Sequence, residues 1–383
     1  MELKDIIALF DEREPADIKV VNTSHGESDF REAVIVRWDD GGAAPDPDDG
    51  GAAPDSDDGA PTPAPDDRMV LKLADNGFTD PERIAMWERL AEEYRKQGCY
   101  CPRFLRTKDG RFPRVEYKGH RCVVYGEEFA RFRSADSFDA AVVSPYGKFT
   151  YLNELLRLNA RIAAARLDFT DLPSAWCLFE IFDPADAVDE VTENAQEWLA
   201  CAEKLPEQFQ EQVSRIWTRW LANREYLKAR YSALPTSVFQ ADLNSTNVLL
   251  DDVGRFAGLM DFNLAGRETY LNYLFREVPF VFGKEDSTSA PDPDKPSSLT
   301  REILQCILHA ITVVREDYPF CEAEKDLALP LFRCLFPLWF TSVEQLKEAT
   351  GEAGIRAALD DAELAQTMDI DFRAYMEGRM SEP

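Results

Sequence analysis

The chain has 383 residues, of which 45% are hydrophobic, and its 43 basic and 71 acidic side chains give a formal net charge of −28. This length and apolar content predict a substantial core divided between two lobes, and the acidic balance excludes the basic surface that a nucleic-acid partner requires. No secretory signal and no membrane-spanning apolar stretch is predicted, so we expect a cytoplasmic protein with no membrane partner.

Three β-branched segments near the N-terminus predict an antiparallel sheet: residues 18–23, 31–38 and 68–73. Residues 41–67, between the last two, form three nine-residue units rich in Gly, Ala, Pro and Asp. This composition cannot bury enough apolar surface to offset chain entropy, so we expect a disordered insertion within a hairpin connection. A calcium-binding repeat is the alternative, but the acidic pairs lack the ligand spacing of a calcium loop.

A helix is predicted over about residues 80–97, because Thr79 and Glu82 have the spacing of a capping box. Glu88 lies at the edge of the apolar face of this helix. A further strand is predicted at residues 121–125. The apolar face consists of Ile84, Trp87, Leu90, Ala91 and Tyr94.

From about residue 151 onward, apolar residues recur at the spacing of helices. Residues 238–262 interrupt this pattern with two short apolar runs flanked by Asp and Asn. The helical segments are 152–167, 194–204, 207–231, 299–316, 324–346 and 351–366. A sheet-rich N-terminal part followed by a helical part is the pattern of an α+β protein.

Residues 238–262 contain side chains suited to phosphoryl transfer. Asp242 and Asn247 bracket a short loop that leads into a strand, and the return strand ends at Asp261. If the two strands pair as a hairpin, Asn247 and Asp261 meet at one end and Asp242 faces them. Carboxylate and amide oxygens hold Mg²⁺ on nucleotide phosphates, and a separate Asp can accept the proton of a hydroxyl group. The alternative is that Asp242 and Asn247 serve only to form turns.

This segment resembles the catalytic loop of the aminoglycoside phosphotransferase and choline kinase-like family, which has His-Gly-Asp-Leu-x-x-x-Asn followed by a hairpin and a metal-binding Asp. Gln240 and Ala241 stand where the family has His-Gly. The histidine is mainly a structural hydrogen-bonding residue in the family, and a glutamine also offers a donor and an acceptor. The residues that match the family pattern are Asp242, Leu243, Asn247 and Asp261.

The same resemblance implies nucleotide-binding residues in the N-terminal half. Lys72 resembles the strand lysine that binds the α- and β-phosphates, and Glu88 resembles its ion-pair partner on the following helix. Residues 123–128 resemble the hinge that holds the base, and residues 22–28 lie where the phosphate-covering loop belongs. The alternatives are a solvated strand lysine and an ordinary helix-surface acid. The other residues assigned to nucleotide binding are Ser24, Gly26, Glu127 and Glu128.

The resemblance implies a protein-kinase-like, two-lobed α+β fold, with an antiparallel-sheet lobe at residues 1–125 and a mainly helical lobe at residues 126–383. ATP or GTP would bind with Mg²⁺ in the cleft between the lobes, and Asp242 would act as the general base. We expect transfer of the γ-phosphoryl group to an aminoglycoside-like compound or another small amino alcohol or sugar. Two alternatives stay open: a pseudokinase that binds nucleotide without turnover, suggested by Gln240 and Ala241, and a scaffold whose acidic repeats recruit a partner.

Overall fold

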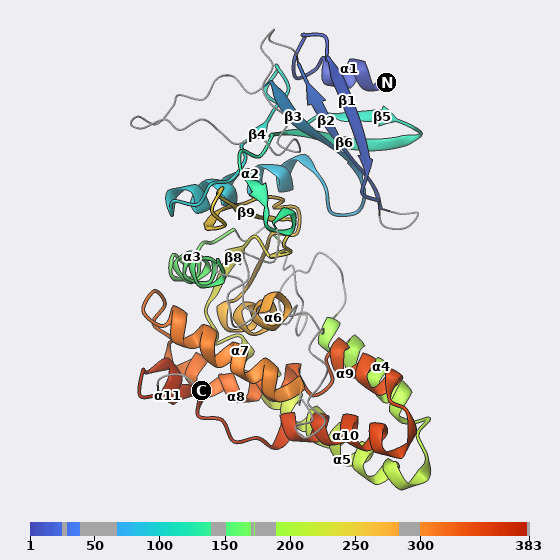
Figure 1. The fold of residues 1–383 in the computed structure, drawn as a ribbon, viewed down its shortest axis with the longest axis vertical. Coiled ribbons are helices and arrows are strands. Elements are labelled where there is room, and N and C mark those ends of the chain that lie inside the picture. Colours follow the sequence, from blue (N-terminus) through green and yellow to red (C-terminus); the bar gives the residue numbers. More distant parts are fainter. Residues whose placement is uncertain are drawn as a thin grey trace. The chain divides into compact units, whose positions relative to one another are not determined.

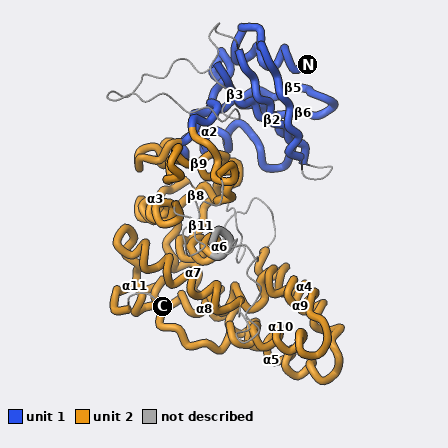
Figure 2. The backbone as a smooth tube through the Cα atoms, in the orientation of Figure 1, with its two compact units in different colours: residues 1–91, 101–131 blue, residues 92–100, 132–383 orange. Residues whose placement is uncertain are grey.

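The computed structural model describes residues 1–24, 29–38, 67–138, 151–169, 172, 189–282 and 299–380, and of residues 279–282 it describes the backbone only. The chain divides into two compact units (Figure 2). Unit 1 comprises Met1–Ala91 and Cys101–Arg131, and unit 2 comprises Glu92–Tyr100 and Phe132–Pro383. The nine-residue repeats at 41–67, apart from their last residue Asp67, lie outside the described residues, as does the predicted binding residue Gly26.

Unit 1 is built on an antiparallel sheet whose strands run in the order β1-β2-β3-β6-β4, with β5 also paired to β6 (Figure 1). The predicted hairpin across the repeats is confirmed, since Arg37 pairs with Arg68 and the Trp38 N–H donates to the Asp67 carbonyl at 2.7 Å. The strands are β1 (Asp17–Asn22), β2 (Phe30–Arg37), β3 (Arg68–Asp75), β4 (Phe104–Leu105), β5 (Arg114–Tyr117) and β6 (His120–Glu128).

Alternation along the strands gives this sheet one apolar face, because successive side chains of a strand point to opposite sides. The core on that face contains side chains from β2, β3 and β6, packed with α1 (Leu3–Ile7). On β3 the alternating residues Met69, Leu71 and Leu73 belong to this core, so Lys72 lies on the opposite face, which also carries the buried Ala74. The same face carries Glu127, a second residue that the sequence assigns to nucleotide binding.

Helix α2 (Pro81–Lys96) begins in unit 1 and ends in unit 2. Its cap is Asp80, whose side chain accepts from the Arg83 N–H at 2.8 Å. The predicted capping box at Thr79 and Glu82 was therefore wrong by one residue. Asp80 takes the cap because the preceding Thr79 is itself fixed outside the helix, where its N–H donates to Asn76 at 2.8 Å.

Unit 2 is mainly helical, as predicted. Helix α6 is central to its packing, since it contacts α7, α8 and β11. The sequence analysis did not predict α6, whose described side chains are all buried, including the polar Asn272, Arg276 and Glu277. The helices are α3 (Leu152–Ala164), α4 (Glu190–Ala202), α5 (Glu207–Tyr231), α6 (Tyr270–Phe282), α7 (Leu299–Val314), α8 (Glu322–Leu335), α9 (Phe340–Glu348), α10 (Gly351–Thr367) and α11 (Phe372–Met376).

The helix predicted at residues 324–346 is two helices, α8 and α9, separated at Phe336–Trp339. Within the described part of the chain, Glu322–Glu348 is the one stretch long and apolar enough to cross a membrane by length and composition. In its most apolar window, 67% is buried inside the protein, as in the core helix of a soluble domain. Packing against α5 and α4 accounts for this apolar character.

The interruption in the helical pattern forms short strands, as predicted. In one small sheet β9 (Val248–Leu250) lies between β10 (Phe256–Leu259) and β7 (Arg133–Ser134). In another, β8 (Thr236–Phe239) pairs with β11 (Gly266–Thr269). The residue Gly258 of β10 must be a glycine, because a Cβ atom there would lie 2.1 Å from the carbonyl oxygen of Tyr100.

Candidate active site

Lys72 lies in the middle of β3, where its neighbours on β6 are polar or aromatic. It pairs with Tyr125 in the strand register, and its ammonium lies 5.9 Å from the centroid of that ring. Its Nζ forms an ion pair of 3.2 Å with Glu127, whose residue is 8% exposed. An ion pair at a site with so little solvent is screened less than one on the surface. The sheet therefore holds a partly buried cation beside a matched carboxylate.

Glu88 has a different partner from the one predicted. Its carboxylate forms an ion pair of 2.5 Å with Arg106, while Lys72 pairs with Glu127. The register explains the difference, because Glu127 is a diagonal cross-strand neighbour of Lys72 on the same face of the sheet. The predicted pairing of Lys72 with Glu88 is thus corrected, and the assignment of both residues to nucleotide binding stays a prediction.

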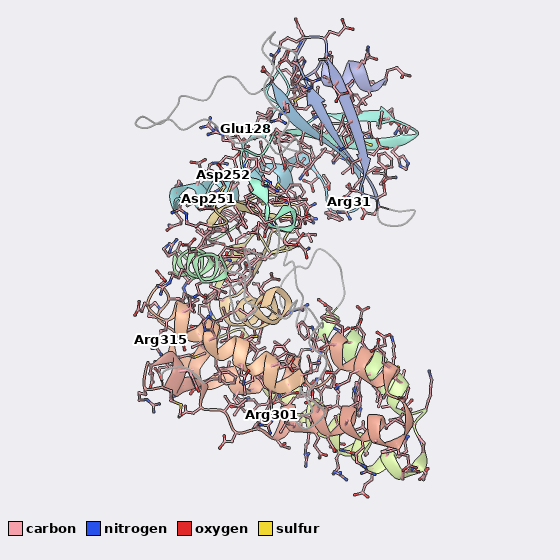
Figure 3. All side chains as sticks on the ribbon, viewed as in Figure 1. Arg31, Glu128, Asp251, Asp252, Arg301 and Arg315 are labelled. Carbon is pink, nitrogen blue, oxygen red and sulfur yellow. The ribbon has the colours of Figure 1, made fainter. Side chains whose placement is uncertain are left out.

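The other residues assigned to nucleotide binding in unit 1 are engaged in local structure. The Glu128 N–H donates to the Arg103 carbonyl at 2.9 Å, which joins β6 to the start of β4 (Figure 3). The Ser24 hydroxyl donates to the Arg31 carbonyl at 3.1 Å and accepts from the Arg31 N–H at 3.0 Å. Each of these bonds stabilises the backbone of the sheet. A role in holding a nucleotide stays a prediction for both residues.

In unit 2 the loop between β8 and β9 carries Asp242. The Asn244 side chain donates to the Asp242 carboxylate, and the Asn247 side chain donates to the Asp242 carbonyl at 3.2 Å. Partial burial raises the pKa of Asp242, and the negative charge of Asp261 raises it further. The two carboxylates therefore lie near enough to interact, and Asp242 retains more affinity for a proton than an exposed aspartate.

The hairpin that follows brings Asn247 and Asp261 to one end, as the sequence predicted. Leu259 pairs with Val248, and the Met260 N–H donates to the Asn247 carbonyl at 2.9 Å. The far end is closed by a turn in which Asp251 accepts from the backbone N–H groups of two later residues (Figure 3). Hydrogen bonds therefore define both ends of the β9–β10 hairpin.

Gln240 is fully buried and joins the loop to the end of β10. Its side-chain nitrogen donates to the carbonyls of Met260 and Asp261, at 3.0 and 2.8 Å. Its side-chain oxygen accepts from the Asp242 N–H at 2.9 Å. The carboxamide therefore uses both donor and acceptor to connect the two segments that carry Asp242 and Asp261, which is the structural role expected of the family histidine.

Two residues of this region adopt left-handed backbone conformations. Ala241 has a φ of 67° and Asp261 has a φ of 57°. A non-glycine residue in this conformation costs about 1–2 kcal/mol. Surrounding contacts must hold these conformations in place, and the hydrogen bonds of Gln240 on either side of Ala241 are such contacts.

The donor atoms at the end of the hairpin fit a hard divalent cation. The side-chain nitrogen of Asn247 donates to the Asp242 carbonyl. The side-chain oxygen of Asn247 is therefore the atom that can bind a metal. Asp261 supplies a carboxylate. Among the described residues no group of three His, Cys, Asp or Glu side chains could hold a metal ion. The oxygen atoms of Asn247 and Asp261 fit Mg²⁺, which keeps several waters and binds through one or two protein groups plus phosphates.

A sequence model of the phosphotransferase enzyme family termed APH matches residues 62–271, more than half of the chain. The chain belongs to this family. Membership confirms the predicted family and the prediction of a phosphotransferase with an alcohol group as acceptor. A comparison with curated proteins finds no match.

Comparison with solved structures gives one match with a TM-score of 0.50. A microcompartment-associated aminopropanol kinase superposes with a TM-score of 0.50 at 13% identity, covering 98% of this chain and 97% of that one. An amicoumacin kinase in complex with AMP-PNP, Ca²⁺ and Ami has a TM-score of 0.43 at 12% identity, covering 95% of this chain and 96% of the other. An aminoglycoside phosphotransferase from Streptomyces rimosus has a TM-score of 0.37 at 15% identity, with coverages of 96% and 99%. The predicted fold, with an N-terminal sheet and a helical C-terminal part, is confirmed.

Proposed function

We propose that this phosphotransferase moves the γ-phosphoryl group of ATP or GTP to a hydroxyl group of a small amino alcohol or amino sugar. The observation that carries the proposal is the convergence in unit 2 of Asp242, Asn247 and Asp261, held together by the side chain of Gln240. Phosphoryl transfer needs positioned oxygen ligands and a base, and little covalent chemistry from the protein.

Asp242 is the proposed base. Its carboxylate would orient the acceptor hydroxyl and receive its proton as the phosphorus–oxygen bond forms. The raised pKa of Asp242, caused by burial and then by Asp261, suits a group that must take up a proton. The Asn244 side chain donates to one carboxylate oxygen, which fixes the direction of the group.

Asn247 and Asp261 are the residues that would hold Mg²⁺, which neutralises phosphate charge when it is bound. Lys72 is proposed to contact the α- and β-phosphates. Its ion pair with Glu127 holds the ammonium in a partly buried place on the sheet. Glu88 would act on nucleotide binding only through Arg106 and the helix it lies on.

An amino-bearing acceptor is supported by the net charge of −28, since an acidic protein attracts cationic ligands. The aminopropanol kinase that shares the fold is named for an acceptor of this kind. The pseudokinase alternative rested on Gln240 and Ala241, and the hydrogen bonds of Gln240 favour an active enzyme instead.

The test is transfer of labelled phosphate from ATP or GTP to a panel of amino alcohols, amino sugars, aminoglycosides and neutral sugars, with Mg²⁺ and with EDTA. We expect Mg²⁺-dependent transfer to an amino-bearing member. Asp242→Asn should abolish turnover while nucleotide binding, followed by thermal shift, persists, because the change removes the base and not a metal ligand. Asp261→Asn should weaken nucleotide binding as well.

Asp252→Asn is the matched control, because this exposed aspartate lies in the turn at the other end of the same hairpin (Figure 3). It should change neither binding nor turnover. Absence of any Mg²⁺-dependent nucleotide binding would contradict the proposal. Nucleotide binding without transfer to any acceptor, together with transfer restored by Gln240→His, would identify a pseudokinase.

A further inference from the structure

Tyr94 lies where α3, the segment around Asp261 and the loop between β8 and β9 meet. This loop carries Asp242 and is called the catalytic loop below. Tyr94 is on the last turn of α2, in the part of that helix that belongs to unit 2, and it is fully buried. Both its hydroxyl and its ring contact segments that carry proposed catalytic groups.

The Tyr94 hydroxyl acts both as donor and as acceptor. It accepts from the backbone N–H of Gln240 at 3.2 Å, and it donates to the side-chain oxygen of Asn159 on α3 at 3.0 Å. All three residues are buried, so solvent does not replace either bond when it is lost. One phenol group therefore connects α3 to the backbone of the catalytic loop, two residues before Asp242.

The Tyr94 ring contacts the segment that carries Asp261. It meets the ring of Phe262 edge to face, with 5.5 Å between the centroids and 75° between the ring planes. An aromatic pair in this geometry contributes more than its buried area alone. Phe262 directly follows Asp261, so the same side chain contacts the neighbour of the proposed metal ligand.

The chain that follows α2 is itself bonded to β10. The Tyr100 N–H donates to the Ala257 carbonyl at 3.0 Å, and the Tyr100 carbonyl accepts from the Leu259 N–H at 2.9 Å. Strand β10 leads directly to Asp261. The end of α2 is therefore anchored to the strand that precedes the metal ligand, and Tyr94 lies on this anchored end.

We propose that Tyr94 is a positioning residue, which sets the separation of Asp242 and Asp261. Its hydroxyl acts on the base, because it holds the loop at Gln240, close to Asp242. Its ring acts on the metal ligand, because it packs on Phe262, next to Asp261. The inference rests on the proposed function, in which these two aspartates are the base and a ligand of Mg²⁺.

Hydrogen exchange of the full-length protein tests the first contact without reference to catalysis. Tyr94→Phe removes the hydroxyl and keeps the ring. We expect the Gln240 amide to exchange about fivefold faster in this variant, the factor that corresponds to a hydrogen bond worth about 1 kcal/mol. The Leu259 amide, which is bonded to Tyr100, should stay within about twofold of the wild type. Unchanged exchange at Gln240, or equal acceleration of both amides, would overturn the proposal.

Tyr231 provides a matched control. It is a second fully buried tyrosine of unit 2, and its hydroxyl donates to Glu268 at 2.9 Å. Tyr231→Phe should lower the stability of unit 2 but change neither kcat nor the exchange of Gln240 relative to Leu259. A selective effect on Gln240 as large as that of Tyr94→Phe would overturn the positioning role.

The kinetic consequence separates the hydroxyl of Tyr94 from its ring. Tyr94→Phe should lower kcat about tenfold and leave the KM for the Mg²⁺ nucleotide within about twofold, because the base moves while the metal ligand stays. Tyr94→Leu, which also removes the ring, should in addition raise that KM about fivefold. Wild-type kcat in Tyr94→Phe, or an equal rise of KM in both variants, would overturn the assignment. If the wild-type chain transfers no phosphate, the proposed function fails, whereas the exchange experiment still decides whether Tyr94 holds the loop.

Discussion

Replacing Glu268 by Gln should remove a pH-dependent loss of stability. Glu268 lies on β11 and is 1% exposed. Its carboxylate accepts from the Tyr231 hydroxyl at 2.9 Å and from the Thr269 N–H at 2.6 Å. Burial nevertheless raises the pKa of Glu268 from 4.5 to about 7, because these two bonds do not replace the lost water.

The direction in which stability changes with pH follows from the number of protons bound in the folded and unfolded states. Above pH 4.5 the unfolded chain loses this proton, whereas the folded protein keeps it until about pH 7. The unfolded state therefore binds fewer protons over that interval, and the free energy of unfolding falls as the pH rises. A difference of about 2.5 pKa units corresponds to at most about 3 kcal/mol, fully lost above pH 7. Gln cannot ionise and keeps an oxygen that accepts from Tyr231 and Thr269.

The assay is urea unfolding of the wild type and Glu268→Gln between pH 5 and pH 8. The stability of the variant relative to the wild type should rise by about 2–3 kcal/mol over this range, since every other titrating group is common to both proteins. Glu225→Gln, which changes a side chain that is 70% exposed, is the control and should give a nearly constant difference. A constant difference for Glu268→Gln as well would refute the reasoning.

Three further changes test the catalytic loop and the N-terminal hairpin. Ala241→Gly should raise the melting temperature, because φ is 67° at this residue and an alanine costs about 1–2 kcal/mol in that conformation. A lower melting temperature would contradict the assigned strain. Gln240→Leu should lower the free energy of unfolding by about 3 kcal/mol and abolish turnover, since it leaves three partly buried backbone groups without this partner. Chemical denaturation and the transfer assay check this, and an unchanged stability would show that the carboxamide does not hold the loop. Replacing residues 41–65 by Asn-Gly should leave the melting temperature within about 2 °C of the wild type, because the hydrogen bond of 2.7 Å from Trp38 to Asp67 already closes the β2–β3 ladder. Misfolding of this variant would contradict the hairpin pairing.

Local patterns predicted much of the fold. The strands of unit 1 alternate apolar and polar residues, and a sheet with one buried face requires that alternation, so β2, β3 and the hairpin between them could be placed. The loop with Asp242 and Asn247 could be placed because it directly precedes one short strand, and Asp261 follows the strand that returns. In each case the information lies within a few residues of the chain.

Features that depend on distant contacts could not be predicted in this way. The sequence analysis assigned Glu88 as the ion-pair partner of Lys72 because Glu88 lies on the following helix. The strand register instead places Glu127 beside Lys72. Helix α6 was not predicted, although its described side chains are all buried. Its contacts with α7 and α8 form only in the folded chain.

The exchange of His-Gly for Gln240 and Ala241 shows how tertiary contacts can outweigh local preference. An alanine at φ 67° disfavours this loop conformation by about 1–2 kcal/mol. Against this, Gln240 makes three hydrogen bonds of 2.8–3.0 Å to backbone groups, each worth about 1 kcal/mol net and more if its partners would otherwise stay buried and unpaired. The contacts exceed the strain, so the loop keeps a left-handed residue without a glycine. The hydrogen bonds of Gln240 therefore determine the geometry of the loop. The position of Asp242 should respond more to changes at residue 240 than to changes at residue 241.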